Sequence, residues 1–159
     1  MATRGILHDF NDGRGPVPAH RHSNGEGWVE NTASVDPGVF VGPEAVVTHT
    51  AKVRHTAYIG DHAIIKDQAI VCDAATVQGR AIVSGLARVK DHAVVEGEAQ
   101  IMDEVVVEDN AVIIGATRLG GNYRASGYTK LAAGTYLRGE ASLKTRQESL
   151  MQIDAMLGG

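Results

Sequence analysis

The stretch of sequence that decides the fold is residues 61–96, which read DHAIIK DQAIVC DAATVQ GRAIVS GLARVK DHAVVE when written six at a time. Every one of these hexads has Ala at its third position and Val or Ile at its fifth. The same period extends from Gly25 to Lys144 as twenty hexads, and nineteen of the fifth positions are Val, Ile or Leu. A hexapeptide period sustained over this length is typical of a β-helix.

The positions within each hexad predict how the chain runs. Third and fifth positions share one face of an extended strand, and the fourth position points the other way. The first position is often Gly, Asp, Asn or Pro, which favour turns. A helix is excluded because apolar residues recur at intervals of two and four rather than 3.6. Three hexads make one triangular coil of 18 residues, so we expect about 6.7 coils and, at ~4.8 Å per coil, a prism ~32 Å long.

Two hexads also carry a resemblance to a known family. Residues 41–46 (VGPEAV) and 59–64 (IGDHAI) are similar to the motif of the hexapeptide-repeat superfamily: an aliphatic residue, a small or acidic residue, two variable residues, a small residue and another variable one. The resemblance covers about three quarters of the chain and implies an all-β fold, a left-handed parallel β-helix. The superfamily includes acyltransferases, γ-class carbonic anhydrases and proteins with no known activity, and trimers are usual among its enzymes.

The repeat predicts three parts: an N-terminal arm (1–24), a β-helix of twenty hexads (25–144) and a C-terminal segment (145–159). Glycines and prolines predict an irregular arm, and we expect it to cover the strand edges that the first coil leaves open. In the last part, Thr145 and Glu148 form a capping box before residues with helical spacing, which predicts a short amphipathic helix.

The arm adds a second, narrower resemblance. Residues 8–10 (HDF) and 25–30 (GEGWVE) resemble the segment that leads into the coils of YdcK-like hexapeptide proteins, in which an Asp-Phe pair precedes a Gly-Gly-Trp-Val turn. Here Glu26 separates the two glycines. Those proteins occur in bacteria and phages and are mostly labelled transferases.

The amino-acid composition restricts the cellular compartment and the classes of binding partner that we expect for this protein. The formal net charge of −4 favours neither a nucleic acid nor an anionic membrane surface as a partner. The single cysteine, Cys72, excludes an internal disulfide and indicates a reducing compartment. The sequence has no signal-peptide core and no apolar run that spans a bilayer, which predicts a cytoplasmic protein, or a virion component if it is phage-encoded.

The histidines offer two candidate metal sites. His20 and His22 lie two apart and share a face of an extended arm. His55 occupies a corner of the prism, and Asp91 occupies the same corner two coils later with His92 beside it. Imidazole and carboxylate groups bind zinc, but neither spacing matches a zinc signature. The alternative, in which these are polar residues of the arm and of solvated corners, predicts no cofactor.

Two further stacked columns contain charged residues. Cys72 lies between Arg54 and Lys90 in successive coils, which favours a lowered pKa of the thiol. Because no acid–base partner accompanies it, we interpret Cys72 as a bystander. Another column contains both acidic and basic residues and predicts a ladder of exposed ion pairs, each worth only ~0–1 kcal/mol; it consists of Glu44, His62, Arg80 and Glu98.

The outward fourth positions form one column on each face of the prism. Face A is largely solvated and consists of Ser34, Lys52, Ile70, Arg88, Val106 and Arg124. The apolar stripe of face B contains Phe40, Tyr58, Val94 and Val112. The column of face C begins with an apolar stripe of Trp28, Val46, Ile64 and Ile82, continues with Gln100 and Arg118, and ends at Tyr136. Stripes of this length indicate an interface, and two different ones predict a homotrimer with face B packed on face C of the next subunit. The alternative is a monomer in which the arm and the C-terminal helix cover the stripes.

The pattern supports two functions of different classes. An unbroken series of coils without a catalytic constellation favours a non-catalytic assembly or binding module, such as a phage or bacterial structural component. The alternative is an acyltransferase or a γ-carbonic-anhydrase-like zinc enzyme with a site between subunits. The acyltransferases of the superfamily typically interrupt the prism with a loop, and the carbonic anhydrases carry a His-x4-His pair; neither feature occurs in residues 25–144.

Overall fold

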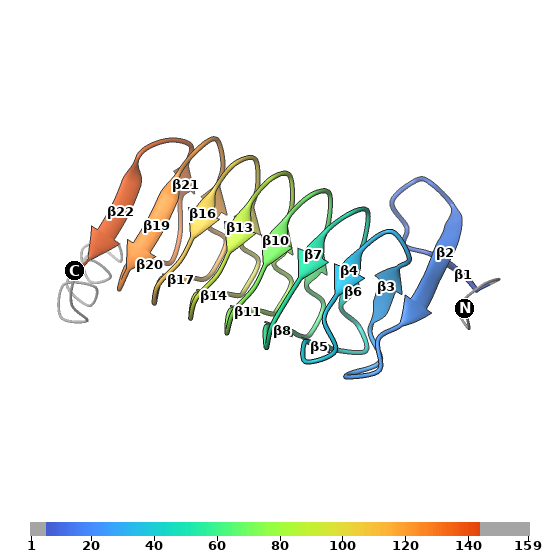
Figure 1. Ribbon diagram of the computed structural model, residues 1–159. Coiled ribbons are helices and arrows are strands. Elements are labelled where there is room, and N and C mark those ends of the chain that lie inside the picture. The colour runs from blue at the N-terminus through green and yellow to red at the C-terminus, as the bar shows by residue number, and fades with distance from the viewer. Residues whose placement is uncertain (1–5, 144–159) are drawn as a thin grey trace.

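The computed structural model describes residues 6–143 and forms a parallel β-solenoid of about six coils (Figure 1). Paired residues in successive coils lie 18 positions apart, as Tyr58, Thr76 and Val94 do. Residues 6–143 contain strands and turns and no helix. The expected all-β coil architecture is therefore confirmed, and it is consistent with the left-handed β-helix. The expected C-terminal helix (145–159) lies outside the described residues.

Three sheets form the sides of the prism, and each contains one of the predicted columns. Face C is a nine-stranded sheet with the order β1 (Leu7–Asp9), β2 (Pro16–Arg21), β3 (Trp28–Glu30), β6 (Val46–Val47), β9 (Ile64–Ile65), β12 (Ile82–Val83), β15 (Gln100–Ile101), β18 (Arg118–Leu119), β21 (Thr135–Tyr136). Face A is a seven-stranded sheet of β4 (Ser34–Val35), β7 (Lys52–Val53), β10 (Ile70–Val71), β13 (Arg88–Val89), β16 (Val106–Val107), β19 (Arg124–Gly127) and β22 (Glu140–Leu143). Face B is a six-stranded sheet of β5 (Phe40–Val41), β8 (Tyr58–Ile59), β11 (Thr76–Val77), β14 (Val94–Val95), β17 (Val112–Ile113) and β20 (Lys130–Leu131).

The inward positions form the core. Ala69 and Val71, the third and fifth residues of one hexad, are both fully buried, and the same holds for Ala87 and Val89 one coil later. A small residue beside each corner and a branched one at mid-strand fill the narrow triangular interior. The expected inward register is therefore confirmed over most of the coils.

The corners depend on left-handed backbone conformations. The first residue of every hexad from His49 to Gly127 has a positive φ, between 52° and 73°. These positions are occupied by Gly, Asp or His, as at Asp61 and Gly79. Gly has no Cβ, and Asp and His tolerate this region better than most residues do. The turn residues recognised in the sequence therefore allow a corner at each sixth residue.

The last coil departs from the expected period. Leu119 pairs with Tyr136, 17 residues later, and Ala125 pairs with Ala141, 16 residues later. Tyr136 therefore enters an inward column and its ring lies 5.3 Å from that of Tyr123, whereas Leu137 is 59% exposed. The prediction of twenty unbroken hexads, with Tyr136 outward and Leu137 inward, was wrong here. Glycines with φ near 100°, Gly134 and Gly139, occupy the two shortened corners.

The N-terminal arm is more regular than the sequence suggested. Strands β1 and β2 form an antiparallel hairpin, and β2 pairs antiparallel with β3, with His20 opposite Val29. The main chain confirms this docking: the Asn31 N–H donates to Pro18 O at 2.9 Å. The prediction of an irregular arm was wrong, but the arm does cover the open edge of the first coil on face C (Figure 1).

Candidate functional site

Aspartates at the corners are used as structural acceptors. The Asp61 carboxylate accepts a hydrogen bond from the Gly79 N–H at 3.1 Å, and Asp67 accepts from Gly85 at 2.9 Å. In each case the donor is the same corner position one coil later. These bonds tie successive coils together through side chains, in addition to the main-chain ladder.

The candidate metal ligands of the prism belong to one of these corner ladders. His55 Nδ1 accepts from the Asp73 N–H at 3.2 Å, Asp73 accepts from Asp91, and Asp91 accepts from Asp109. Asp73 thus lies between His55 and Asp91, which the structure does not bring together. His92 is exposed beside Asp91. Within residues 6–143 no three His, Cys, Asp or Glu side chains are grouped so that they could hold a metal ion.

The two histidines of the arm have separate partners. His20 Nδ1 lies 2.7 Å from Asn31 Oδ1, and it is partly buried. His22 is 6% exposed, and its Nε2 lies 2.7 Å from the carbonyl oxygen of Val39. Each imidazole therefore anchors the arm to a different part of the first coil.

Cys72 behaves differently from the expectation based on its cationic neighbours. Burial raises the pKa of its thiol, and the adjacent Asp73 raises it further. Lys90 acts in the opposite direction but is the weaker influence. The prediction of a lowered pKa was wrong, because the neighbours in sequence and the burial of the sulfur outweigh the charge one coil away.

The apolar stripe of face B lies on four strands of one sheet. The Phe40 and Tyr58 rings are stacked, with centroids 4.8 Å apart and planes 9° from parallel, and Tyr58 is 41% exposed. Val94 and Val112 continue the column and are partly buried. A Cβ at Gly60 would lie 2.5 Å from the Tyr58 ring, so the ring packs directly against this glycine.

The apolar stripe of face C is partly covered by the arm. Val46, Ile64 and Ile82 follow one another in register and are partly buried. Trp28, at the start of the stripe, stacks on His8 with ring centroids 4.1 Å apart, and the Arg21 guanidinium carbon lies 4.6 Å from the indole centroid.

The stacking of His8 on Trp28 places the imidazole where its pKa is lowered. Burial lowers the pKa of the His8 imidazole, and the positive charge of Arg21 lowers it further. The arm therefore covers Trp28, one of the predicted interface residues, with an aromatic and a cationic side chain.

A cleft of about 470 Å³ lies at the corner between faces B and C. Its lining includes the stacked rings of Phe40 and Tyr58 together with Glu44, His62 and Arg80. No ion pair joins Glu44, His62 and Arg80 within the described chain, so the column exists but the predicted charge ladder does not form.

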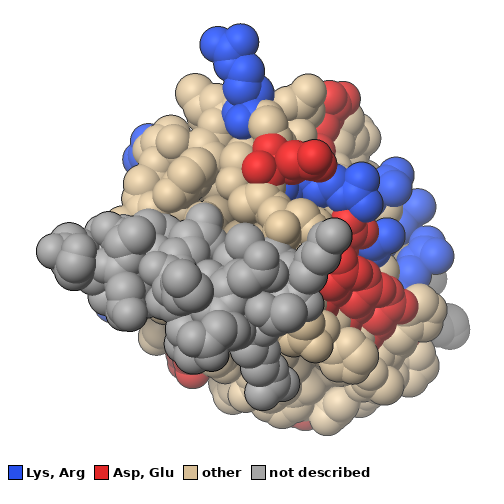
Figure 2. All heavy atoms as spheres, turned by 90° about the vertical axis from the view of Figure 1, so that its left-hand side faces the viewer, with Lys and Arg blue, Asp and Glu red and all other residues tan. Residues whose placement is uncertain are grey.

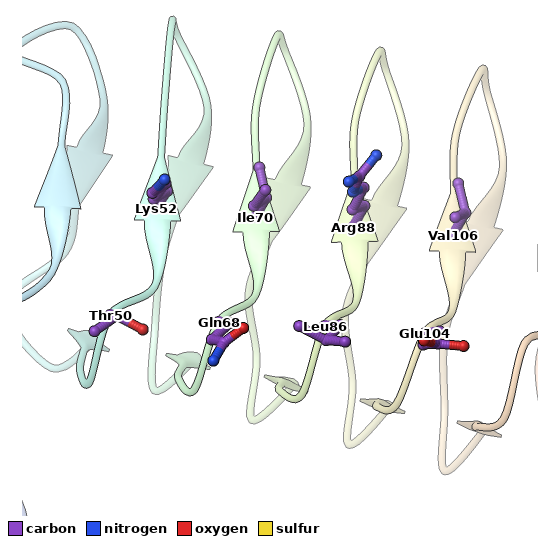
Figure 3. Close-up of a pocket in the computed structure, with 8 residues that line it drawn as sticks. All are labelled: Thr50, Lys52, Gln68, Ile70, Leu86, Arg88, Glu104 and Val106. Atoms are coloured by element: carbon purple, nitrogen blue, oxygen red, sulfur yellow. The ribbon is translucent and has the colours of Figure 1, made fainter.

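Face A contains a groove with a volume of about 530 Å³ (Figure 3). Two parallel rows of side chains line it, one on the strands and one at the preceding corner, and both run across four coils. The strand row is Lys52, Ile70, Arg88 and Val106, and the corner row is Thr50, Gln68, Leu86 and Glu104. The end-on view in Figure 2 shows many charged side chains along its right-hand side, the side turned to the viewer in Figure 1.

The sequence reading treated face A as a solvated surface and missed this groove. The strand row alternates a cation with an aliphatic residue, and Leu86 in the corner row is 50% exposed. Within residues 6–143, neither Lys52 nor Arg88 forms an ion pair. The missed signal was the second position of each hexad, which forms a column of its own beside the fourth.

Within residues 6–143 no helix is long and apolar enough to cross a membrane. Comparisons with models of protein families, with curated proteins and with solved structures gave no match to this chain. The likeness to hexapeptide-repeat proteins and to the YdcK-like group therefore stays a prediction.

Proposed function

We propose that this chain is a non-catalytic assembly and binding module that forms a homotrimer, with face B of one subunit packed on face C of the next. The observation that carries the proposal is the pair of outward apolar stripes, in which Tyr58 is 41% exposed and Ile64 is only partly buried. Full burial of one large apolar side chain contributes about 1.5–3 kcal/mol before the cost of association is subtracted.

The use of the corners supports a structural role. Carboxylates such as Asp73 and Asp91 accept backbone N–H groups of the next coil, so they hold the prism together. A rigid prism with flat sides suits repeated packing against other subunits, as in a structural component of a phage or bacterial assembly.

Light scattering tests the trimer. We expect the wild type to have three times the 16.8 kDa mass of the chain, and the Tyr58→Glu/Ile64→Glu variant to have the mass of one chain. Ser34→Glu/Ile70→Glu places the same two charges on face A and should leave the trimer intact. A wild-type mass near 16.8 kDa contradicts the proposal.

The alternative proposal is an enzyme whose site lies between subunits, as an acyltransferase or a zinc-dependent hydratase. It is favoured by the cleft at the corner between faces B and C, in which the exposed His62 lies beside an aromatic pair. Stoichiometric zinc in the purified protein, or micromolar binding of acetyl-CoA by calorimetry, would contradict the proposal of a non-catalytic module and favour the enzyme.

A further inference from the structure

We propose that the groove on face A binds an extended acidic peptide of a partner protein, in polyproline II conformation and with Asp or Glu at every third position. Its carboxylates pair with Lys52 and Arg88. The inference rests on the proposed function as a binding module. It names the class of partner that binds face A, the face that the proposed trimer leaves exposed.

The spacing of the two cations favours this conformation. Lys52 and Arg88 both pair with Ile70, one on each side, so they lie two coils apart, or about 9.6 Å at ~4.8 Å per coil. A polyproline II helix has three residues per turn and a rise of ~3.1 Å, so every third side chain returns to the same side after ~9.3 Å. A β-strand returns to the same side after ~6.8 Å and again after ~13.6 Å, which matches neither one coil nor two.

The floor of the groove also disfavours a β-strand as the ligand. Its main-chain groups are already bonded between coils: the Lys52 N–H donates to Ala69 O, and the Ile70 N–H donates to Ala87 O, both at 2.9 Å. A strand needs main-chain partners, whereas a polyproline II segment has a solvated backbone and binds through its side chains. Ile70, which lies between the two cations, and the exposed Leu86, in the same coil as Arg88, provide apolar contacts for proline rings.

The charges of the groove define where the peptide ends. Lys52 and Arg88 are exposed and form no ion pair within the described chain, so a carboxylate displaces no existing partner. Glu104 lies in the fourth coil of the groove, one coil beyond Arg88, and opposes the approach of acidic side chains to that end of the groove. Three intervals of ~4.8 Å give a groove of ~14 Å, which accommodates about five residues at ~3.1 Å each.

Fluorescence anisotropy with a labelled (Pro-Pro-Glu)4 peptide tests the proposal. We expect saturable binding that (Pro-Pro-Gln)4 does not show, and binding at least tenfold weaker for a peptide of the same composition with its four Glu residues adjacent. Glu104→Gln should strengthen binding severalfold, because it removes the one carboxylate of the groove. Equal binding of the two acidic peptides would contradict the proposal, since it would indicate attraction without a matching register.

Matched variants locate the site. Lys52→Glu/Arg88→Glu should abolish binding, and Lys52→Met/Arg88→Met should weaken it at least tenfold without introducing repulsion. Arg54→Glu/Arg80→Glu makes the same change in net charge with two exposed arginines outside the groove and should bind within twofold of the wild type. Loss of binding in this control would overturn the assignment to face A. Thermal melting of each variant establishes that it is folded, and the two groove variants provide separate tests.

Competition distinguishes the class of partner. A sulfated oligosaccharide or single-stranded DNA that displaces the peptide at a lower concentration than unlabelled (Pro-Pro-Glu)4 would overturn the peptide assignment. Light scattering on the same samples separates this inference from the proposed trimer. An intact trimer that does not bind the peptide rejects the groove proposal alone, and a monomer that binds it rejects the trimer alone.

Discussion

Arg14 and Glu30 join the N-terminal arm to the first coil through two parallel hydrogen bonds, from Nη1 to Oε2 at 2.9 Å and from Nη2 to Oε1 at 2.8 Å. The Glu30 side chain is 6% exposed and also accepts from the His49 N–H at 2.7 Å. The Arg14 guanidinium holds the pKa of the Glu30 carboxyl below its ordinary value, and the His49 N–H acts in the same direction. The Glu30 carboxyl must therefore be ionised in the folded state for this ion pair to hold the arm on the first coil.

This ion pair predicts a dependence of stability on acid. A carboxyl whose folded pKa is lowered contributes stability above its unfolded value, here 4.5, and loses that contribution as the pH falls through the folded pKa. We expect Glu30→Gln to be less stable than the wild type at pH 7, with a difference that shrinks below about pH 4.5. Urea unfolding between about pH 7 and 3 measures it. A difference that grows in acid would show that the sign is wrong.

A charge placed in the core should prevent folding. Val71 is fully buried and its third-position neighbour Ala69 is too, so an aspartate at residue 71 has no water and no partner. We expect Val71→Asp to cost several kcal/mol and to give no cooperative melting transition. Arg88→Asp, on the exposed side of the next coil, should melt like the wild type. A soluble Val71→Asp protein with a cooperative transition would disprove the inward register.

The corner ladder predicts an order of stability at residue 91. Asp91 has a φ of 60° and its Oδ2 accepts from the Asp109 N–H at 3.0 Å. Asn keeps the acceptor and tolerates this φ, Gly keeps only the conformation, and Ala keeps neither. We expect Asp91→Gly to lose about 0.5–1.5 kcal/mol and Asp91→Ala about 1–2 kcal/mol more, with Asp91→Asn near the wild type.

Measuring the zinc content of the three residue-91 variants tests the metal site that the sequence suggested at His55, Asp91 and His92. If Asp91 acts through the ladder alone, the three variants have the zinc content of the wild type. A loss of zinc in Asp91→Asn, without a loss of stability, would assign the carboxylate to a metal instead.

Because Tyr58 packs on Gly60, we expect a methyl group added at Gly60 to destabilise the fold more than one added at Gly42. Gly60 and Gly42 occupy the same column, but a Cβ at Gly60 would lie 2.5 Å from the Tyr58 ring, whereas at Gly42 it would lie 3.4 Å from the Phe40 ring. We expect Gly60→Ala to destabilise the fold by about 1–3 kcal/mol and Gly42→Ala by clearly less. Combining Gly60→Ala with Tyr58→Ala should recover part of the loss. Equal melting temperatures for the two alanine variants would contradict this packing.

The sequence by itself determined which residues face inward and which column lies on which face. Val71 and Val89 could be assigned to the core, and Tyr58 to face B, because both facts follow from two local periods: the alternation along a strand and the 18-residue stack. A parallel coil contacts only its neighbours, so a regular repeat transmits this register from coil to coil.

Only the tertiary structure decided what the side chains contact and where the period fails. Tyr136 enters the core because a ring fits beside Tyr123 there, and this depends on the space left by a residue 13 positions earlier. The docking of Arg14 on Glu30 and the groove between Lys52 and Arg88 likewise join residues from different strands or coils. A hexad pattern describes one strand at a time, so it contains the register of each side chain but not the free energy of its contacts across coils.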